Sequence, residues 1–347
     1  MNPLLAVPAI LLLVHRAWSR QSLTPLGLAA AAGTAVIHAL HPSPTPFALL
    51  VVFYLAGTKA TKVNHAQKAG LTLSATGSEG GEERRTHIQV LANSVVASIL
   101  VLVDVFGLGK TRDGCFSPMN GSDLAMVGIV GNYAAVAADT LSSELGILSP
   151  TPPRLLTSAS LRVVPRGTNG GVTLTGLAAG VSGAFAVAAT SAILLPFCAG
   201  RARAVWVVGM TGWGGLGSVL DSVLGGVLQA SVVDKRSGKV VEGTGGMKVL
   251  VHPSSTKPGA PADVGDAPLT ADSVQLRHTE AVANTATLRG SRATGSSERS
   301  QEGRPHESRQ ESRRVESGRD VLDNNAVNVL MAATMSVGAM GIAWLSA

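Results

Sequence analysis

Residues 171–199 read GVTLTGLAAGVSGAFAVAATSAILLPFCA, a run of 29 residues without a charged side chain. A helix needs roughly 20 residues, at about 1.5 Å each, to cross the hydrocarbon core of a bilayer. This stretch is therefore long enough to span a membrane, and it indicates that the chain is a membrane protein.

Seven further apolar blocks accompany this span. Three of them also reach the length of a full span: Ile88–Leu108, Ala204–Val233 and Ala326–Ser346. The other four are shorter or interrupted by proline: Pro3–Val14, Leu23–Leu40, Pro46–Ala56 and Leu124–Ala138. The pattern predicts an all-α fold, a polytopic transmembrane helix bundle of six to eight spans.

The composition excludes several other classes of protein. Of the 347 residues only 14% are charged and 46% are hydrophobic, too little charge for the surface of a soluble enzyme. The two cysteines, Cys115 and Cys198, fit neither a disulfide framework nor a CxxC metal site, which excludes a secreted disulfide scaffold and a zinc finger. The net charge of +6 forms no basic stripe with aromatic residues, so no nucleic-acid partner is predicted.

A polar insert interrupts the apolar pattern before the last block. Residues 252–318 contain seven Val or Leu residues and no aromatic residue, too little apolar surface to offset the entropy of ordering the chain. We therefore predict a disordered insert. The predicted regions are 1–57 (N-terminal apolar spans), 58–233 (membrane core with the polar motifs), 234–320 (disordered polar insert) and 321–347 (last motif and last span).

The distribution of basic residues indicates the orientation of the bundle. With eight spans, the loops after the first, third and fifth blocks carry two, five and three Lys or Arg residues, and those after the second, fourth and sixth carry none, two and two. The positive-inside rule then predicts that the odd-numbered loops, the polar motifs and the insert face the cytosol. We expect a multi-pass protein of an endomembrane, with the lipid bilayer as a partner and no signal for an oligomeric state.

The first polar motif is Asp-Thr-Leu-Ser-Ser-Glu-Leu-Gly at 139–146. On a continuous helix the carboxylates of Asp139 and Glu144 point about 140° apart. They converge only if the helix breaks or ends between them.

The second motif is Pro-Arg-Gly-Thr-Asn-Gly-Gly-Val-Thr at 165–173, directly before the long uncharged span. A glycine-rich loop at a helix N-terminus presents backbone N–H groups and partial positive charge to an anion. The candidate phosphate-binding residues are Arg166, Gly167, Thr168, Asn169, Gly170 and Gly171. Taken alone, the motif fits a turn and a helix N-cap better.

Two further motifs place polar side chains within or beside apolar blocks. Asp221 lies between Gly217 and Gly225 on a helix face of small residues, which allows close helix packing. Placing an Asp at the centre of a membrane span costs about 3 kcal/mol. At the mouth of the last block lie Asp323, Asn324, Asn325 and Asn328, whose simplest role is helix capping. Asp104 is a further acid within an apolar block and is interpreted as structural.

Together, the motifs bring Asp, Glu and Asn oxygens and a glycine loop to one membrane face. Such hard oxygen ligands suit Mg²⁺, with Asp139, Glu144 and Asp221 as candidate metal ligands. A phosphate loop beside them favours phosphoryl or nucleotidyl transfer. Two other hypotheses remain: a transporter or exchanger that uses Asp139 and Asp221 as an ion site, and a noncatalytic membrane organiser.

The four motifs in this order resemble one integral membrane family, the transmembrane protein 19 family, which includes plant and cyanobacterial phytyl-phosphate kinases. Arg85, Gln89 and Asn93 also fit its pattern, and the insert at 252–318 departs from it. The resemblance implies an enzyme that phosphorylates a prenyl monophosphate, with CTP or another nucleoside triphosphate as donor. The resemblance places three groups of residues in the site: the acids Asp139, Glu144, Asp221 and Asp323, the phosphate loop 168–171, and the amides Asn324, Asn325 and Asn328. Their roles are inferred from their chemistry.

Overall fold

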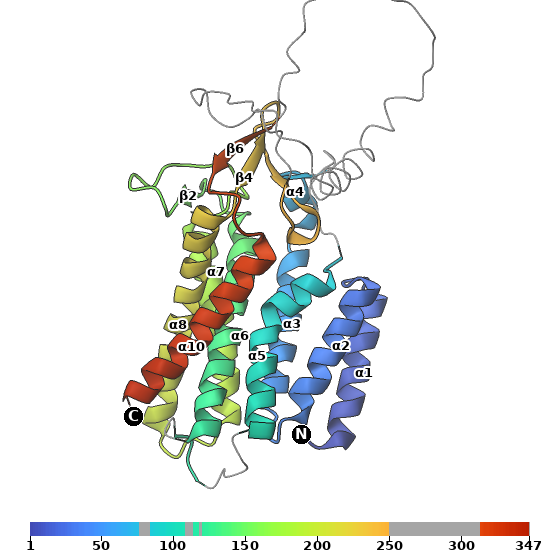
Figure 1. The fold of residues 1–347 in the computed structure, drawn as a ribbon, viewed down its shortest axis with the longest axis vertical. Helices are drawn as coiled ribbons and strands as arrows, with labels where there is room; N and C mark the ends of the chain where they lie inside the picture. The colour runs from blue at the N-terminus through green and yellow to red at the C-terminus, as the bar shows by residue number, and fades with distance from the viewer. Residues whose placement is uncertain (76–83, 108–113, 118–119, 250–312, 347) are drawn as a thin grey trace, which may run out of the picture. The chain divides into compact units, whose positions relative to one another are not determined.

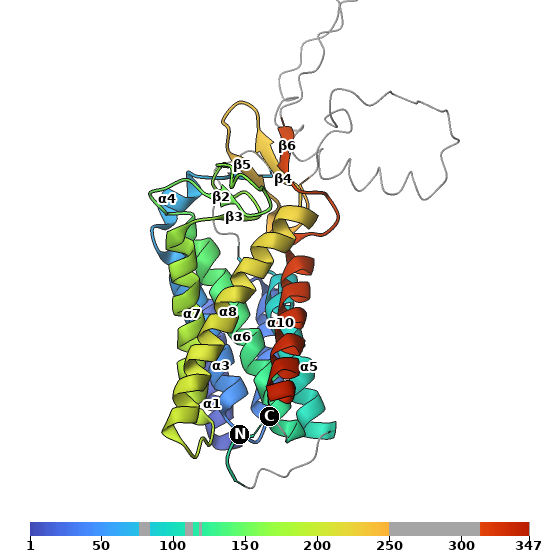
Figure 2. The same ribbon diagram turned by 90° about the vertical axis from the view of Figure 1, so that its left-hand side faces the viewer.

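The computed structural model describes residues 1–75, 84–107, 114–117, 120–249 and 313–346. Most of these residues are helical, and the long helices run alongside one another as a bundle (Figures 1 and 2). The bundle helices are α1 (Pro3–Ser19), α2 (Pro25–Leu40), α3 (Thr45–Lys62), α5 (His87–Gly107), α6 (Gly121–Gly146), α7 (Leu174–Leu194), α8 (Gly200–Leu228) and α10 (Asn324–Ser346). A short helix, α4 (His65–Ala69), follows α3.

Among the described residues, four helices are long and apolar enough to cross a membrane: α5, α6, α7 and α10. The predicted helical membrane bundle is confirmed. The block Leu124–Ala138 was predicted too short, because the 26-residue α6 continues through the polar motif to Gly146. Helix α8 has 29 residues but is not among the four, since glycines and polar residues lower its hydropathy.

Helix α6 forms the centre of the bundle and packs against α3, α5, α7, α8 and α10. Its contact with α8 is very close: a Cβ atom added to Gly214 would lie 2.7 Å from the carbonyl oxygen of Ala134, and one added to Gly217 would lie 2.5 Å from Cβ of Ala135. Small residues allow helix backbones to approach in this way. The glycines of α8 thereby hold it against α6 about one helical turn before Asp139 and Asp221.

Short strands gather at one end of the bundle (Figure 1). One sheet has the order β1-β5-β4-β6, with β4 and β5 antiparallel (Val232 opposite Val241) and β1 and β5 parallel (Leu73 opposite Val241). The second sheet pairs β2 with β3 in antiparallel fashion. The strands are β1 (Leu73–Ser74), β2 (Arg154–Leu155), β3 (Gly171–Val172), β4 (Ser231–Asp234), β5 (Val240–Glu242) and β6 (Arg313–Ser317).

These strands correct the predicted bounds of the polar insert, 234–320. Strand β5, the 3₁₀ turn η1 (Thr244–Gly246) and β6 lie within those bounds. Val240 and Val241 are 3% and 4% exposed, so this part of the chain does bury apolar surface. The remainder of the predicted insert, 250–312, lies outside the described residues.

The two cysteines form a disulfide, although their number and spacing predicted no disulfide framework. Cys115 precedes α6, Cys198 precedes α8, and their Cα atoms are 5.4 Å apart. Phe116, Phe197 and Trp206 pack their rings together beside this bond. The cysteines are 83 residues apart in the sequence, so only the packing of the helices brings them within bonding distance.

We expect the double variant Cys115→Ser/Cys198→Ser to unfold at lower temperature in detergent. A disulfide that closes a long loop contributes about 2–4 kcal/mol. Thermal unfolding with and without reductant measures the effect, and the reductant should leave the double variant unchanged. Labelling of both cysteines by maleimide in unreduced, denatured protein would contradict the pairing.

Candidate functional site

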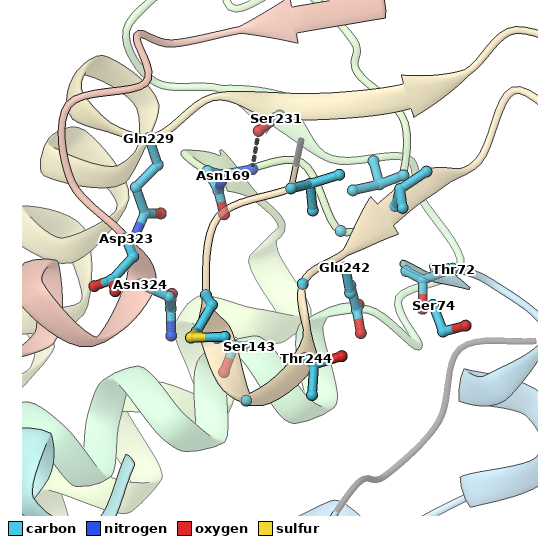
Figure 3. Close-up of a pocket in the computed structure, with 18 of the residues that line it drawn as sticks. Thr72, Ser74, Ser143, Asn169, Gln229, Ser231, Glu242, Thr244, Asp323 and Asn324 are labelled. Carbon is cyan, nitrogen blue, oxygen red and sulfur yellow. Dashed lines mark hydrogen bonds between the residues drawn. The ribbon is translucent and has the colours of Figure 1, made fainter. Parts of the chain in front are cut away.

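A pocket of about 410 Å³, called here the polar pocket, lies where the strands meet the ends of the helices. Its walls come from the ends of α3 and α6, from α4 and β1, from the start of α5, and from β4, β5 and the start of α10. Asp323 and Asn324 lie on one side of it, and Glu242 and Thr72 on the other (Figure 3).

Two basic side chains converge on Glu144 at one wall of the polar pocket. Lys68 Nζ donates to Glu144 Oε2 over 2.7 Å, and the Thr61 hydroxyl donates to Oε1 over 3.0 Å. Arg85 lies 4.0 Å from Oε1 and donates to Thr61 Oγ1 over 3.0 Å. The side chains of Lys68 and Glu144 are only 11% and 24% exposed, so solvent screens this pair less than a surface pair. Glu144 therefore positions two cations at the pocket.

A third cation, Lys248, lines the polar pocket beside the residues that precede α10. Its Nζ lies 3.1 Å from Asp320 Oδ1 and donates to the carbonyl oxygen of Val321 over 3.0 Å. The turn that carries Lys248 is fastened to α10 by Asn325, whose Nδ2 donates to the Gly245 carbonyl over 3.0 Å. Asn325 thus shapes the polar pocket through this turn.

Glu242 contributes a carboxyl group with unusual electrostatics. Burial by the pocket walls raises its pKa, the charge of Glu144 raises the pKa further, and a hydrogen bond with Thr72 opposes the shift. The Glu242 side chain is nevertheless exposed to the open pocket, and solvent there limits the size of this shift. A raised carboxyl pKa means that the negative charge is disfavoured here, and a bound cation would offset that penalty.

Asp323 and Asn324 line the pocket at the start of α10. Asp323 Oδ1 accepts a hydrogen bond from the Ala326 N–H over 2.8 Å, which is the capping role that the motif indicated. Gln229 lies beside them and is 5% exposed, and within the described part of the chain its Nε2 has no hydrogen-bond partner. A ligand in the pocket could therefore accept a hydrogen bond from the Gln229 amide at this wall.

Much of the glycine loop at 165–171 is bonded within the protein. Arg166 donates to the carbonyl oxygens of Ile147 and Ser149, which fastens the loop to the end of α6. The N–H of Thr168 bonds the Pro165 carbonyl, and that of Asn169 bonds Ser231 Oγ over 2.8 Å.

The glycines of this loop have mainly conformational roles. Gly167 and Gly170 have φ values of +85° and +80°, and the N–H of Gly171 bonds the Thr168 carbonyl. Of the six predicted phosphate-binding residues, Gly167 and Asn169 line the polar pocket. The loop thus serves mainly as a turn, which was the simpler of the two interpretations of its motif.

Asp139 and Asp221 meet between α6 and α8, and their carboxyl groups are within hydrogen-bonding reach of each other. The neighbouring acceptors assign which end of the Asn328 amide is nitrogen. In that orientation Nδ2 donates to Asp221 Oδ1 over 3.3 Å and to the Asn324 carbonyl oxygen over 3.1 Å. Within the described residues, neither carboxyl pairs with Lys, Arg or His. Two adjacent carboxyl groups without a counter-charge must share a proton or bind a cation.

This carboxyl pair lies beneath the polar pocket. Ser143 and Asn324 line the pocket, and each stands four residues, or about one helical turn of 5.4 Å, from Asp139 and Asn328 on its own helix. The pair is therefore about one turn below the pocket floor, deeper in the bundle.

Glu144 does not join this pair. Helix α6 is unbroken from Gly121 to Gly146, so Glu144 faces Thr61 and Lys68 whereas Asp139 faces Asp221. The break that convergence required is absent from this described helix.

The donor groups at the carboxyl pair fit Mg²⁺. This cation is held by one or two carboxylates, with water and substrate phosphates completing six positions. Asp139 and Asp221 supply two such groups with no competing cation in the described part of the chain. The described residues contain no cluster of three or more His, Cys, Asp or Glu side chains that would hold a metal by themselves.

Several pocket residues were missed in the sequence analysis. Lys68, Glu242 and Lys248 lie outside the four motifs. The only signal for Lys68 was its membership of a basic loop, which was used to infer orientation.

The fold and the site define an integral membrane helix bundle with a charged pocket at one end. A family model described as "Integral membrane protein DUF92" matches residues 8–336, and the chain belongs to this family. This assignment confirms the resemblance of the motifs.

Curated relatives come from a plant and an archaeon. "Protein PGR" of Arabidopsis thaliana is 38% identical over 202 residues, which cover 56% of this chain and 68% of the relative. "Uncharacterized membrane protein MJ0933" of Methanocaldococcus jannaschii is 32% identical over 40% of this chain and 49% of the relative. "Protein VTE6, chloroplastic" of Arabidopsis thaliana is 29% identical over 43% of this chain and 40% of the relative. The chain thus spans less than half the length of the last two relatives. No solved structure matches the chain.

Proposed function

We propose that the protein is a Mg²⁺-dependent kinase that transfers a phosphoryl group from CTP or another nucleoside triphosphate to a prenyl monophosphate. The observation that carries this proposal is the arrangement of Lys68, Arg85 and Lys248 around one pocket above the Asp139–Asp221 pair. Phosphoryl transfer needs cations that hold phosphates and offset developing charge. The resemblance of the motifs to a family with phytyl-phosphate kinases supports this reaction class.

In the proposed reaction an anionic oxygen of the prenyl monophosphate forms a bond to the γ-phosphorus. The bond from that phosphorus to the β–γ bridging oxygen breaks, and a nucleoside diphosphate leaves. Arg85 and Lys68 hold phosphate oxygens, and Glu144 keeps both side chains in place. Asp139 and Asp221 would hold Mg²⁺, which when bound neutralises phosphate charge.

We also propose that the pocket faces the cytosol of an endomembrane. The basic loops lie at the pocket end, in agreement with the positive-inside rule. The Cys115–Cys198 bond joins loops at the other end, and disulfides persist in oxidising compartments such as the endoplasmic reticulum lumen.

The proposal is tested by an assay of purified protein in detergent with Mg²⁺. Geranylgeranyl, farnesyl and phytyl monophosphates are each combined with γ-labelled CTP or ATP. We expect label in a prenyl diphosphate for at least one pair, and no label when Mg²⁺ is chelated. Folded protein that transfers no label from any pair would overturn the proposal.

The second candidate is an ion or proton exchanger, which the uncompensated Asp139–Asp221 pair favours. Flux through liposomes containing the protein distinguishes the two. Coupled flux without phosphoryl transfer would support the exchanger.

A further inference from the structure

A second pocket lies within the membrane bundle, between α1, α2, α3 and α5. Its volume is about 90 Å³, and most of its lining is apolar, with Leu13, Leu28, Leu50 and Phe53 among its walls. We call it the apolar pocket.

The few polar side chains in the apolar pocket are largely engaged with neighbouring groups. The hydroxyls of Thr34 and Ser94 lie 3.4 Å apart, and Asn93 Nδ2 donates to the Gln89 carbonyl over 3.0 Å. The Tyr54 hydroxyl lies 3.5 Å from Ser22 Oγ. The pocket is therefore suited to hydrocarbon rather than to a polar ligand.

The apolar pocket adjoins the polar pocket. Arg85 and Gln89 line both pockets. A ligand at this junction would meet a guanidinium on one side and hydrocarbon on the other. That arrangement suits an amphiphile whose anionic group is attached directly to an apolar chain.

We propose that the apolar pocket binds the isoprene unit next to the phosphate of the acceptor lipid, with Arg85 holding that phosphate at the junction. This inference rests on the proposed function and assigns the acceptor site within it. The guanidinium of Arg85 already faces the polar pocket through Thr61 and Glu144, so the phosphate is delivered to the side where the donor phosphates bind.

The volume of the apolar pocket limits what it can accept. An apolar cavity of about 150 Å³ takes one benzene molecule. At about 90 Å³ the pocket is smaller than that cavity and admits at most one branched five-carbon unit, so the rest of the tail must continue into the bilayer. In phosphatidic acid the group next to the phosphate is a polar glycerol that carries two chains, and a small apolar pocket disfavours such a group, so we expect the site to prefer single-chain prenyl phosphates.

The first test fills the apolar pocket from α2. Ala32 lines it and is half-buried, whereas Ala29 lies on the same helix, outside the pocket, and is exposed. We expect Ala32→Phe to raise the KM for farnesyl monophosphate at least tenfold while the KM for the donor nucleotide stays unchanged. Ala29→Phe is the matched control and should leave both constants unchanged. An unchanged farnesyl monophosphate KM in folded Ala32→Phe would overturn the inference, and Ala31→Leu repeats the test if Ala32→Phe does not fold.

The second test does not depend on turnover. A farnesyl monophosphate carrying a diazirine on its first isoprene unit is photolysed with the wild-type protein, and labelled peptides are mapped. We expect labels on residues of α2, α3 or α5 that line the apolar pocket, suppressed by excess farnesyl monophosphate and weakened in Arg85→Ala. Such labels without phosphoryl transfer would uphold the binding site and reject the kinase. Transfer with labels confined to other helices would uphold the kinase and reject this site.

Discussion

Asp221→Asn is expected to lower phosphoryl transfer by about 100- to 1,000-fold, the loss seen when one preorganised charge-stabilising group is removed. Asparagine keeps the shape of aspartate but removes the charge that would hold Mg²⁺ beside Asp139. It also relieves repulsion between two carboxyl groups that, in the described structure, have no basic partner. We therefore expect the variant to be at least as stable as the wild type.

Rate and thermal unfolding are measured on the same detergent preparation. Asp234→Asn is the matched control, because Asp234 lies in β4 outside the polar pocket and its carboxylate accepts hydrogen bonds from Ser237. It should retain activity. A stable Asp221→Asn protein with wild-type transfer would remove the carboxyl pair from the proposed site.

Gly170→Ala is expected to destabilise the protein by about 2–5 kcal/mol, from left-handed backbone strain and overpacking together. Gly170 has a φ of +80°, and an added Cβ would lie 2.7 Å from both Cα of Gly226 and the carbonyl oxygen of Ser222. Those atoms belong to the backbone of α8, so a side-chain rotation cannot relieve the contact.

Gly238→Ala separates the two contributions. Gly238 has a φ of +68°, and a Cβ there would meet no atom within 4 Å. This variant therefore carries the backbone strain alone, about 1–2 kcal/mol. Thermal unfolding in detergent compares the pair, and equal losses would show that the loop does not pack against α8 as described.

The helical architecture could be read from the sequence because a membrane span has a simple signature of length and apolar composition. Helices α5 and α10 match the predicted blocks to within two residues at each end, and α7 is three residues shorter than the block 171–199 at its start and five at its end. The short sheets could not be read in this way. Strands of two to five residues, such as β1 and β6, form only because distant segments pair with them.

The polar motifs indicated which region of the chain carries the site, but their acidic side chains lie at two separate places in the structure. Asp139 and Asp221 came together as a pair, whereas Glu144 joined Lys68 and Arg85. Helical periodicity predicted that Asp139 and Glu144 would diverge on an unbroken helix, and the sequence carried no sign of whether α6 would break. The basic partners of Glu144 come from α4 and the segment before α5.

The class of protein, the family and the end of the bundle where the polar groups gather could all be predicted before the helices were packed together. Those properties depend on composition, on short motifs and on the order of spans along the chain. Three features arise only from the packing of the helices: Cys115 pairs with Cys198, Arg85 and Gln89 join a polar pocket to an apolar one, and two carboxyl groups meet below the pocket floor. Each of these depends on distances between segments far apart in the sequence, and close packing of small residues between helices sets those distances.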